Sequence, residues 1–169
     1  MLYYPLSMAD STPHPRLYFA SDHAGFALKR VLMEYASTLG VAVEDIGPFE
    51  LNPEDDYPDF VTLLAEKVAA EAGTRGVVIG ASGQGEAMCA NRVKGVRAGV
   101  FYGEPSRSQT DANGQSLGMV ESMRAHNDAN VLSLGARFVS EEEAREALRI
   151  FLETPFSGSA RHLRRIGKF

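Results

Sequence analysis

Short apolar runs alternate with helical patterns along this chain, and this alternation constrains the fold more than any other feature. Five runs are typical of strands, and an amphipathic segment follows most of them. The run Gly-Val-Val-Ile-Gly, residues 76–80, is nearly all apolar, as expected for a strand that is covered on both faces. The alternation favours a parallel α/β sheet. The predicted strands comprise residues 16–20, 41–45, 76–80, 96–101 and 130–135.

Glycine, proline and serine mark the ends of the helices between these strands. Gly40 and Gly73 stand at C-terminal stop positions, Pro58 suits a first turn, and Ser140 with Glu143 forms a capping box. We expect a doubly wound sheet with strand order 2-1-3-4-5. The helices are expected at about residues 25–39, 58–72, 86–93, 117–126 and 141–153.

The composition fits one soluble domain. The chain has 169 residues and a net charge of −5, which argues against a nucleic-acid partner or an anionic membrane surface. Its single cysteine, Cys89, excludes an intrachain disulfide and favours a reducing compartment, so we expect a cytoplasmic protein. Residues 1–15 contain no Lys or Arg and are predicted to be a flexible N-terminal arm before a single domain at 16–169. Residues 102–116 are polar and turn-rich, and we expect an exposed irregular loop there.

A glycine loop follows the third strand and opens the next helix. Its sequence, residues 80–86, is Gly-Ala-Ser-Gly-Gln-Gly-Glu. Backbone N–H groups in such a loop favour bound anions. The Walker, dinucleotide and nucleophile-elbow patterns all fail, because Glu86, Met88 and Gln84 occupy positions that those patterns reserve for other residues. From the loop alone, a tight turn without a ligand is an equally good explanation.

Glu86 also has two explanations at this stage. An acidic side chain at the start of a helix stabilises the helix N-terminus. A positioned and partly desolvated carboxylate can instead act as a general base next to a carbonyl. In that case the N–H groups of Gly83 and Gly85 and the hydroxyl of Ser82 would stabilise the developing enediolate oxygen.

Polar residues also follow the first strand. Asp22 and His23 stand at its carboxyl end, and in the expected sheet the first and third strands are neighbours. Asp22 and Glu86 are therefore expected in one crevice, although Asp22 has the alternative role of capping the first helix. His126 lies at a helix end, where histidine is usually structural.

The C-terminal segment is basic. Arg161 and Arg165 share one face if this segment is helical, and guanidinium groups match the oxygens of a phosphate. A solvated basic end is the alternative. No His, Cys and carboxylate set has metal-ligand spacing. Cys89 is interpreted as a small buried helix residue.

Several segments together resemble the type B ribose-5-phosphate isomerase and galactose-6-phosphate isomerase family, from about Arg16 onward. They are ASDHAGFALK, DYPDF, GASGQGEAMCANRVKGVRA, HNDANVLSLGAR and TPFSGSARHLRRI. The resemblance implies a Rossmann-like three-layer α/β/α domain and a homodimer. It also implies aldose–ketose isomerisation of a phosphorylated sugar through an enediolate, without metal or cofactor. The simplest substrate is ribose 5-phosphate.

The same resemblance implies roles for individual residues. One branch of the family uses a cysteine as base at the position of Gly80, whereas another uses a glutamate at the position of Glu86, so Glu86 is the implied base here. Cys89 does not align with the catalytic cysteine. Ser82 with the amides of Gly83 and Gly85 would hold the enediolate oxygen. The other implied roles are a sugar site lined by Asp22, His23 and Tyr57, ring opening by His126, hydroxyl binding by Asn127, and phosphate binding by Arg137, Arg161 and Arg165 with His162 close by.

One departure from the family pattern leaves the substrate open. The segment between Arg97 and His126 is longer than usual, and the extra residues fall in the loop that begins at Tyr102. A six-carbon or free sugar is therefore an alternative substrate, and a non-catalytic sugar-phosphate-binding protein is an alternative function. The C-terminal arginines would reach across a dimer interface, in a dimer or in a tetramer of such dimers.

Overall fold

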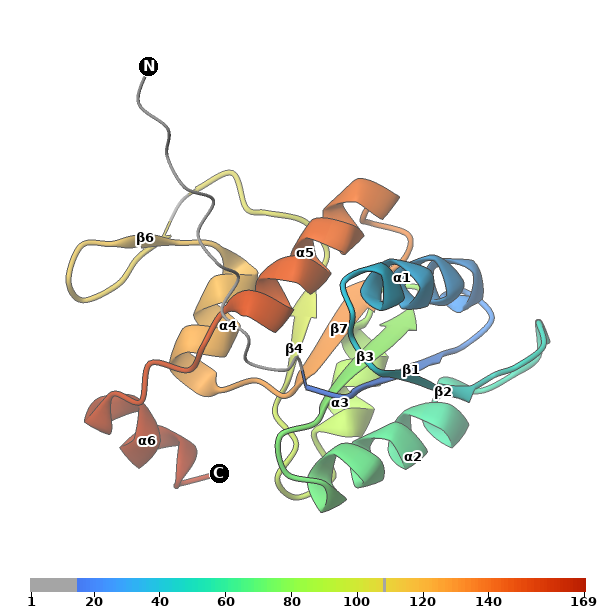
Figure 1. Cartoon of the computed structure of the whole chain (residues 1–169), viewed down its shortest axis with the longest axis horizontal. Helices are drawn as coiled ribbons and strands as arrows, with labels where there is room; N and C mark the ends of the chain where they lie inside the picture. The colour runs from blue at the N-terminus through green and yellow to red at the C-terminus, as the bar shows by residue number, and fades with distance from the viewer. Residues whose placement is uncertain (1–14, 108) are drawn as a thin grey trace.

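The computed structural model describes residues 15–107 and 109–169 and consists of a parallel sheet between two helical layers (Figure 1). Most of the predicted N-terminal arm, residues 1–14, lies outside the described residues. The α/β fold class and the parallel sheet are confirmed. The five strands are β1 (Leu17–Ser21), β2 (Val43–Gly47), β3 (Arg75–Gly80), β4 (Ala98–Phe101) and β7 (Val131–Gly135).

The order of the strands is β2-β1-β3-β7-β4, so the predicted order 2-1-3-4-5 is wrong for the last two strands. The final strand, β7, pairs with β3 on one side and with β4 on the other. Both strands consist largely of apolar residues, so hydrophobicity alone does not order them. Strand β7 lies in the interior of the sheet and β4 forms its edge. Burial follows this order, since all five residues of β7 are buried, whereas three of the four residues of β4 are only partly buried.

Two helices cover one face of the sheet and three cover the other. Helices α2 (Tyr57–Ala70) and α3 (Gln84–Ala90) pack together over one apolar core. The opposite face carries the larger core, under the helices α1 (Phe26–Thr38), α4 (Met119–Asn127) and α5 (Glu141–Glu153). A short C-terminal helix, α6 (Ala160–Ile166), contacts α4. None of the helices described has the length and apolar character needed to cross a membrane.

The segment predicted to be an irregular loop contains a small hairpin, which corrects that prediction. Strands β5 (Gln109–Thr110) and β6 (Ser116–Leu117) pair antiparallel, and the hairpin stands away from the sheet beside α4 (Figure 1). Asp111 closes the turn, since its Oδ1 accepts the backbone N–H groups of Asn113 and Gln115 at 2.8 Å each. The predicted exposure of the segment is confirmed for most of its described residues.

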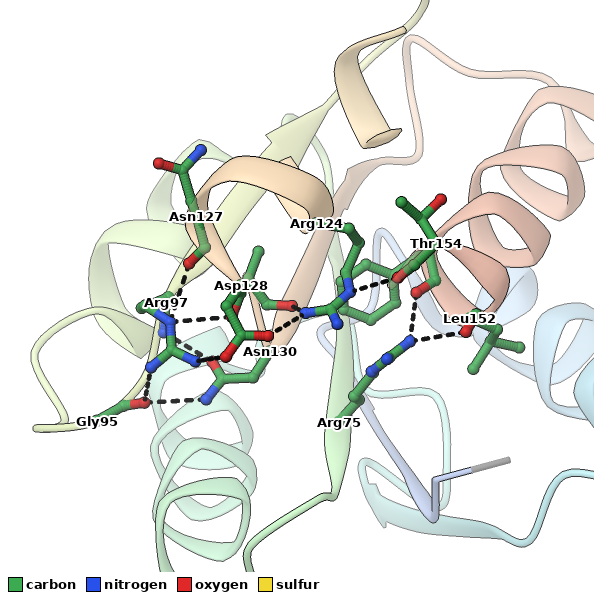
Figure 2. A network of polar contacts seen from close by, with 11 residues as sticks. Arg75, Gly95, Arg97, Arg124, Asn127, Asp128, Asn130, Leu152 and Thr154 are labelled. Atoms are coloured by element: carbon green, nitrogen blue, oxygen red, sulfur yellow. Dashed lines mark hydrogen bonds and ion pairs between the residues drawn. The ribbon is translucent and has the colours of Figure 1, made fainter. Parts of the chain in front are cut away.

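At the amino edge of the sheet, three arginines bind the ends of helices (Figure 2). Arg75 donates to two carbonyl oxygens in the last turn of α5, and Arg97 to two at the end of α4. Arg124 donates to Asp128 at 2.9 Å and to the carbonyl oxygens of Ala129 and Thr154. Such contacts satisfy carbonyl groups that a helix C-terminus leaves without partners. This network is a structural feature of the amino edge.

Candidate active site

The glycine loop between β3 and α3 requires glycine for two reasons. Gly83 has φ +74°, in the left-handed region, and a Cβ there would lie 2.9 Å from the carbonyl carbon of Leu134. The buried hydroxyl of Ser133 donates to the carbonyl oxygen of Gly83 at 2.6 Å. Ser133 on β7 therefore anchors the glycine loop through this hydrogen bond. Ser82 accepts the N–H of Gln84 at 3.3 Å, so its hydroxyl supports the first turn of α3 and can still donate to a ligand.

Glu86 points back over the end of β3. The residue is only 4% exposed. A Cβ added at Gly80 would lie 1.6 Å from Oε1 of Glu86, so the carboxylate fills the space that a side chain at position 80 would need. The family resemblance implies a cysteine base at position 80 in another branch, and the carboxylate of Glu86 fills the space at that position from the following helix.

The environment makes Glu86 a stronger base than a surface carboxylate. Burial raises the pKa of Glu86, and the charge of Asp22 adds to this rise, whereas the residue's own backbone N–H opposes it. A carboxylate with a raised pKa takes up a proton more readily while it is still ionised above that pKa. These features are those expected of a general base and exceed what a helix N-terminus requires.

Asp22 has a local structural role as well. Its Oδ1 accepts the N–H groups of Ala24 at 2.9 Å and of Gly25 at 3.1 Å, which fixes the turn into α1. Gly25 is needed there because a Cβ would lie 2.2 Å from the carbonyl oxygen of Ile79. Asp22 thus fixes the turn before α1 but does not cap the helix, because the N-cap residue is Gly25 and no side chain forms a capping hydrogen bond there. The expected proximity of Asp22 to Glu86 is supported by its effect on the pKa of Glu86.

Three more predicted residues reach this edge. The ring of His23 contacts Asp55, just before α2, with Nδ1 at 2.8 Å from Oδ1. Tyr57 packs against the loop, since a Cβ at Gly85 would lie 2.7 Å from the Tyr57 hydroxyl. Arg137 follows β7, and its backbone N–H binds the carbonyl oxygen of Ala81. We call these residues the carboxyl-edge group: Asp22, His23, Tyr57, Ser82, Gly83, Gly85, Glu86 and Arg137.

The remaining predicted residues form a second cluster. The rings of His126 on α4 and His162 on α6 stack with centroids 4.4 Å apart and planes at 8°. They line a cavity of about 480 Å³ together with Asn127, Arg161 and Arg165. The expected helix exists, and it places both arginines at one cavity. We call these five residues the amino-edge group. Residues 109–113 of the hairpin line the same cavity.

Burial lowers the pKa of His162, and the neighbouring charges of His126, Arg161 and Arg165 lower it further. A neutral His162 beside two arginines leaves the cavity with a net positive charge at neutral pH. A cavity of this charge and size suits an anion such as a phosphate group.

The two groups lie at opposite ends of the sheet within one chain. Glu86 packs over Gly80, at the carboxyl end of β3, whereas Asn127 precedes β7 and contacts Arg97 just before β4. The strands between these ends are five or six residues long, which separates the edges by roughly 15 Å. One chain therefore does not bring its predicted residues into one site.

Two residues of this region were missed by the sequence analysis. Asp55 stands in a run of acidic residues, Glu54–Asp56, and nothing in the sequence distinguishes it from its neighbours. Ser133 did leave a signal, because it is the only polar residue in the strand Val-Leu-Ser-Leu-Gly. Among residues 15–107 and 109–169, no group of three or more His, Cys, Asp or Glu is arranged to hold a metal ion.

Comparisons with known proteins identify the family of this chain. The profile of the family described as Ribose/Galactose Isomerase matches residues 17–169. The chain belongs to this family. It is 39% identical to a probable ribose-5-phosphate isomerase B of Mycoplasma pneumoniae, over 92% of each chain. It is 34% identical to ribose-5-phosphate isomerase B of Mycobacterium leprae, over 89% of this chain and 85% of that one.

A solved structure has the same fold. Ribose-5-phosphate isomerase B of Mycoplasma genitalium, crystallised with bound ribulose 5-phosphate, superposes with a TM-score of 0.78 at 36% identity. The match covers 90% of this chain and 92% of that one. The Rossmann-like fold that the resemblance implied is thereby confirmed.

Proposed function

We propose that this chain interconverts ribose 5-phosphate and ribulose 5-phosphate, with Glu86 as the base. The observation that carries the proposal is the buried carboxylate of Glu86, held against Gly80 at the end of β3 with a raised pKa. The curated relatives named above support the same reaction. The preference for a reducing compartment, given by a single cysteine, leads us to propose a cytoplasmic location.

The proposed reaction moves one proton between two carbons. Glu86 removes the proton from C2 of the open-chain aldose, and the C2–H electrons form the C1–C2 double bond of an enediolate with its charge on O1. The N–H groups of Gly83 and Gly85 and the hydroxyl of Ser82 stabilise that charge. The hydroxyl proton of O2 passes to O1, and Glu86 returns its proton to C1. The product is the ketose.

The complete site in this proposal is built by two copies of the chain. The carboxyl-edge group of one copy supplies the base and the enediolate site, and the amino-edge group of its partner supplies ring opening by His126 and phosphate binding by Arg161 and Arg165. The separation of the two groups within one chain supports this arrangement. Exposed apolar side chains on adjacent helices also support an interface, since Leu63 on α2 is 51% exposed and Met88 on α3 is 69% exposed.

The test of the proposed base is the variant Glu86→Gln, with aldose–ketose conversion of ribose 5-phosphate as the measurement. We expect kcat to fall by about 10²–10⁴-fold, the usual contribution of a general base, with KM within a few-fold of the parent. Solvent deuterium incorporation at C2 of ribose 5-phosphate should be lost in parallel.

The matched control is Cys89→Ser, one turn further along the same helix. Cys89 is partly buried beside Thr62, and the proposal gives it no role. This variant should keep parental kcat. A Glu86→Gln protein that isomerises at the parental rate would refute the role of Glu86.

A longer phosphorylated sugar is the second candidate substrate, because the hairpin lines the amino-edge cavity. A panel of five- and six-carbon aldose phosphates separates the two candidates. Ribose 5-phosphate should have the highest kcat/KM. A six-carbon aldose phosphate with a higher value would replace it, and binding without any conversion would favour a non-catalytic sugar-phosphate-binding protein.

A further inference from the structure

Asp55 is a buried carboxylate that holds one residue of the carboxyl-edge group. Its side chain is 6% exposed. One oxygen, Oδ1, accepts both the backbone N–H of His23 at 2.9 Å and a hydrogen bond from the ring Nδ1 at 2.8 Å. The two contacts fix the backbone and the ring of His23 together. Asp55 itself is far along the chain, immediately before α2.

These contacts determine which nitrogen of His23 carries a proton. An ionised carboxylate can only accept hydrogen bonds, so Nδ1 must be the donor. Nε2 is then the nitrogen left for another partner, and no residue in the described part of the chain hydrogen-bonds to it. The side chain of His23 is 36% exposed, so a ligand can reach the ring.

The charged groups around His23 favour its protonated form. The hydrogen bond to Asp55 raises the pKa of His23, and the charges of Asp22 and Asp55 add to this rise. Partial burial and the charge of Arg137 oppose it. These groups come from the β1–α1 turn, from the segment before α2 and from the segment after β7, so they are the charges that face the ring from each neighbouring element.

The second oxygen of Asp55 indicates that stability alone does not explain this carboxylate. Oδ2 is buried and has no hydrogen-bond partner among residues 15–107 and 109–169. A buried acceptor without a partner costs free energy, on the order of 1–3 kcal/mol. An asparagine could accept the same N–H with its amide oxygen at a lower desolvation cost, because it carries no charge. The stability of the fold therefore does not explain why a negatively charged residue stands at position 55.

We propose that Asp55 is a positioning residue that keeps Nδ1 of His23 protonated and presents Nε2–H of a cationic His23 to an oxygen of the substrate. This inference rests on the proposed function for the identity of that substrate. His23 then stabilises negative charge on the substrate at the carboxyl edge. The ligand contact belongs to His23, and Asp55 acts through it.

The variant Asp55→Asn separates charge from shape. The amide oxygen can still accept both hydrogen bonds, so the fold should remain, but the negative charge is removed. The pKa of His23 should fall, which moves the high-pH limb of kcat/KM to lower pH. Activity should drop about tenfold at a pH between the old and new limbs, and recover toward the parental value at lower pH. The matched control is Asp56→Asn, an exposed neighbour for which no hydrogen bond to His23 is present.

The readout on His23 itself is a histidine nitrogen NMR titration of the free protein. In the parent we expect a proton on Nδ1 throughout and a pKa above the ordinary histidine value, which Asp55→Asn should lower. An Nε2-protonated neutral ring in the parent, or an unchanged titration in Asp55→Asn, would overturn the inference. The inference would also be overturned if Asp55→Asn lowers the pKa of His23 but leaves the high-pH limb of kcat/KM in place. The charge on His23 would then not contribute to activity.

The two proposals fail differently. If the parent protein does not isomerise ribose 5-phosphate, the proposed function fails, and the NMR titration still decides whether Asp55 controls the protonation of His23. The parental tautomer can be measured without any variant, so a variant that does not fold leaves the inference open to refutation.

Discussion

Buried polar groups differ in their hydrogen bonding between the carboxyl edge and the amino edge of the sheet. At the carboxyl edge, Glu86 is a buried carboxylate with a raised pKa, and the buried atoms Ser21 Oγ and Asp55 Oδ2 have no hydrogen-bond partner in the described part of the chain. At the amino edge, Arg124 is just as buried but donates to Asp128 and to two carbonyl oxygens (Figure 2). Uncompensated polar groups are costly, and their presence at the carboxyl edge supports the proposed position of the base there. The compensated edge stabilises the fold.

Substitutions at the two ends of β3 test the difference between the edges within a single strand. Gly80→Ala should reduce kcat by about 10²–10³-fold, because the new Cβ lies 1.6 Å from the carboxylate of Glu86 and displaces the proposed base. The carboxylate is the free end of a side chain, so the free energy of unfolding should change little. Steady-state kinetics and urea unfolding measure the two effects.

Gly76→Ala, at the amino end of the same strand, is the control. Its Cβ would meet Leu64 at 2.5 Å in the core, so it should lower the free energy of unfolding by about 1–3 kcal/mol and leave kcat near the parental value. Equal effects of the two variants on kcat would remove the distinction between the edges.

Removal of positive charge from the amino-edge cavity should weaken substrate binding more than it lowers the free energy of unfolding. Replacing both Arg161 and Arg165 by alanine should raise KM for ribose 5-phosphate by about 10²–10⁴-fold, since charge-assisted hydrogen bonds contribute about 1.5–3 kcal/mol each. Both side chains are exposed, so unfolding should be unaffected.

Arg164→Ala is the control for this pair. Arg164 lies between them on the same helix and is not among the residues that line the cavity. It should leave KM unchanged, and an equal rise in KM would indicate a general effect of positive charge in place of a phosphate site.

Substitution in the network of Arg75, Arg97 and Arg124 should instead lower the free energy of unfolding more than it weakens substrate binding. Arg124→Ala removes one of the two arginines that donate to Asp128 and leaves two helix-end carbonyl groups without a donor, which should lower the free energy of unfolding by about 3 kcal/mol in urea titrations. Arg149→Ala removes exposed ion pairs on α5 and should cost less than about 1 kcal/mol. If Arg149→Ala costs as much as Arg124→Ala, burial is not what makes the network important.

The smallest predicted effect concerns stability and pH. Because the pKa of Glu86 is raised in the folded protein, its ionised form destabilises the fold above that pKa, and this cost disappears as the pH falls and the group takes up a proton. Glu86→Gln should therefore raise the free energy of unfolding at neutral pH by about 1 kcal/mol. The gain should shrink as the pH is lowered in thermal unfolding, and a gain that grows toward low pH would have the wrong sign.

The sequence predicts the elements well because strands and helices have different apolar periods, and it predicts the carboxyl-edge group because strand ends in a parallel sheet meet at one edge. It does not predict that β7 lies between β3 and β4 in the sheet, because the segments before and after β4 carry the same helical signals. It cannot select Asp55 from three consecutive acidic residues, because only burial separates it from its neighbours. The family resemblance assigns His126 and Glu86 to one site, and strand direction places them at opposite edges of one chain, so a site that contains both requires two copies.

The central claim is that a working site combines the carboxyl edge of one copy with the amino edge of another, and mixing two inactive variants tests it most directly. Glu86→Gln lacks the base, and the double variant Arg161→Ala with Arg165→Ala lacks the phosphate site. After subunit exchange in an equal mixture, random pairing in a two-fold dimer should restore about a quarter of the parental activity, since half of the dimers carry one intact site. If subunits exchange and activity stays at the level of the separate variants, both groups serve the same chain and the account is wrong.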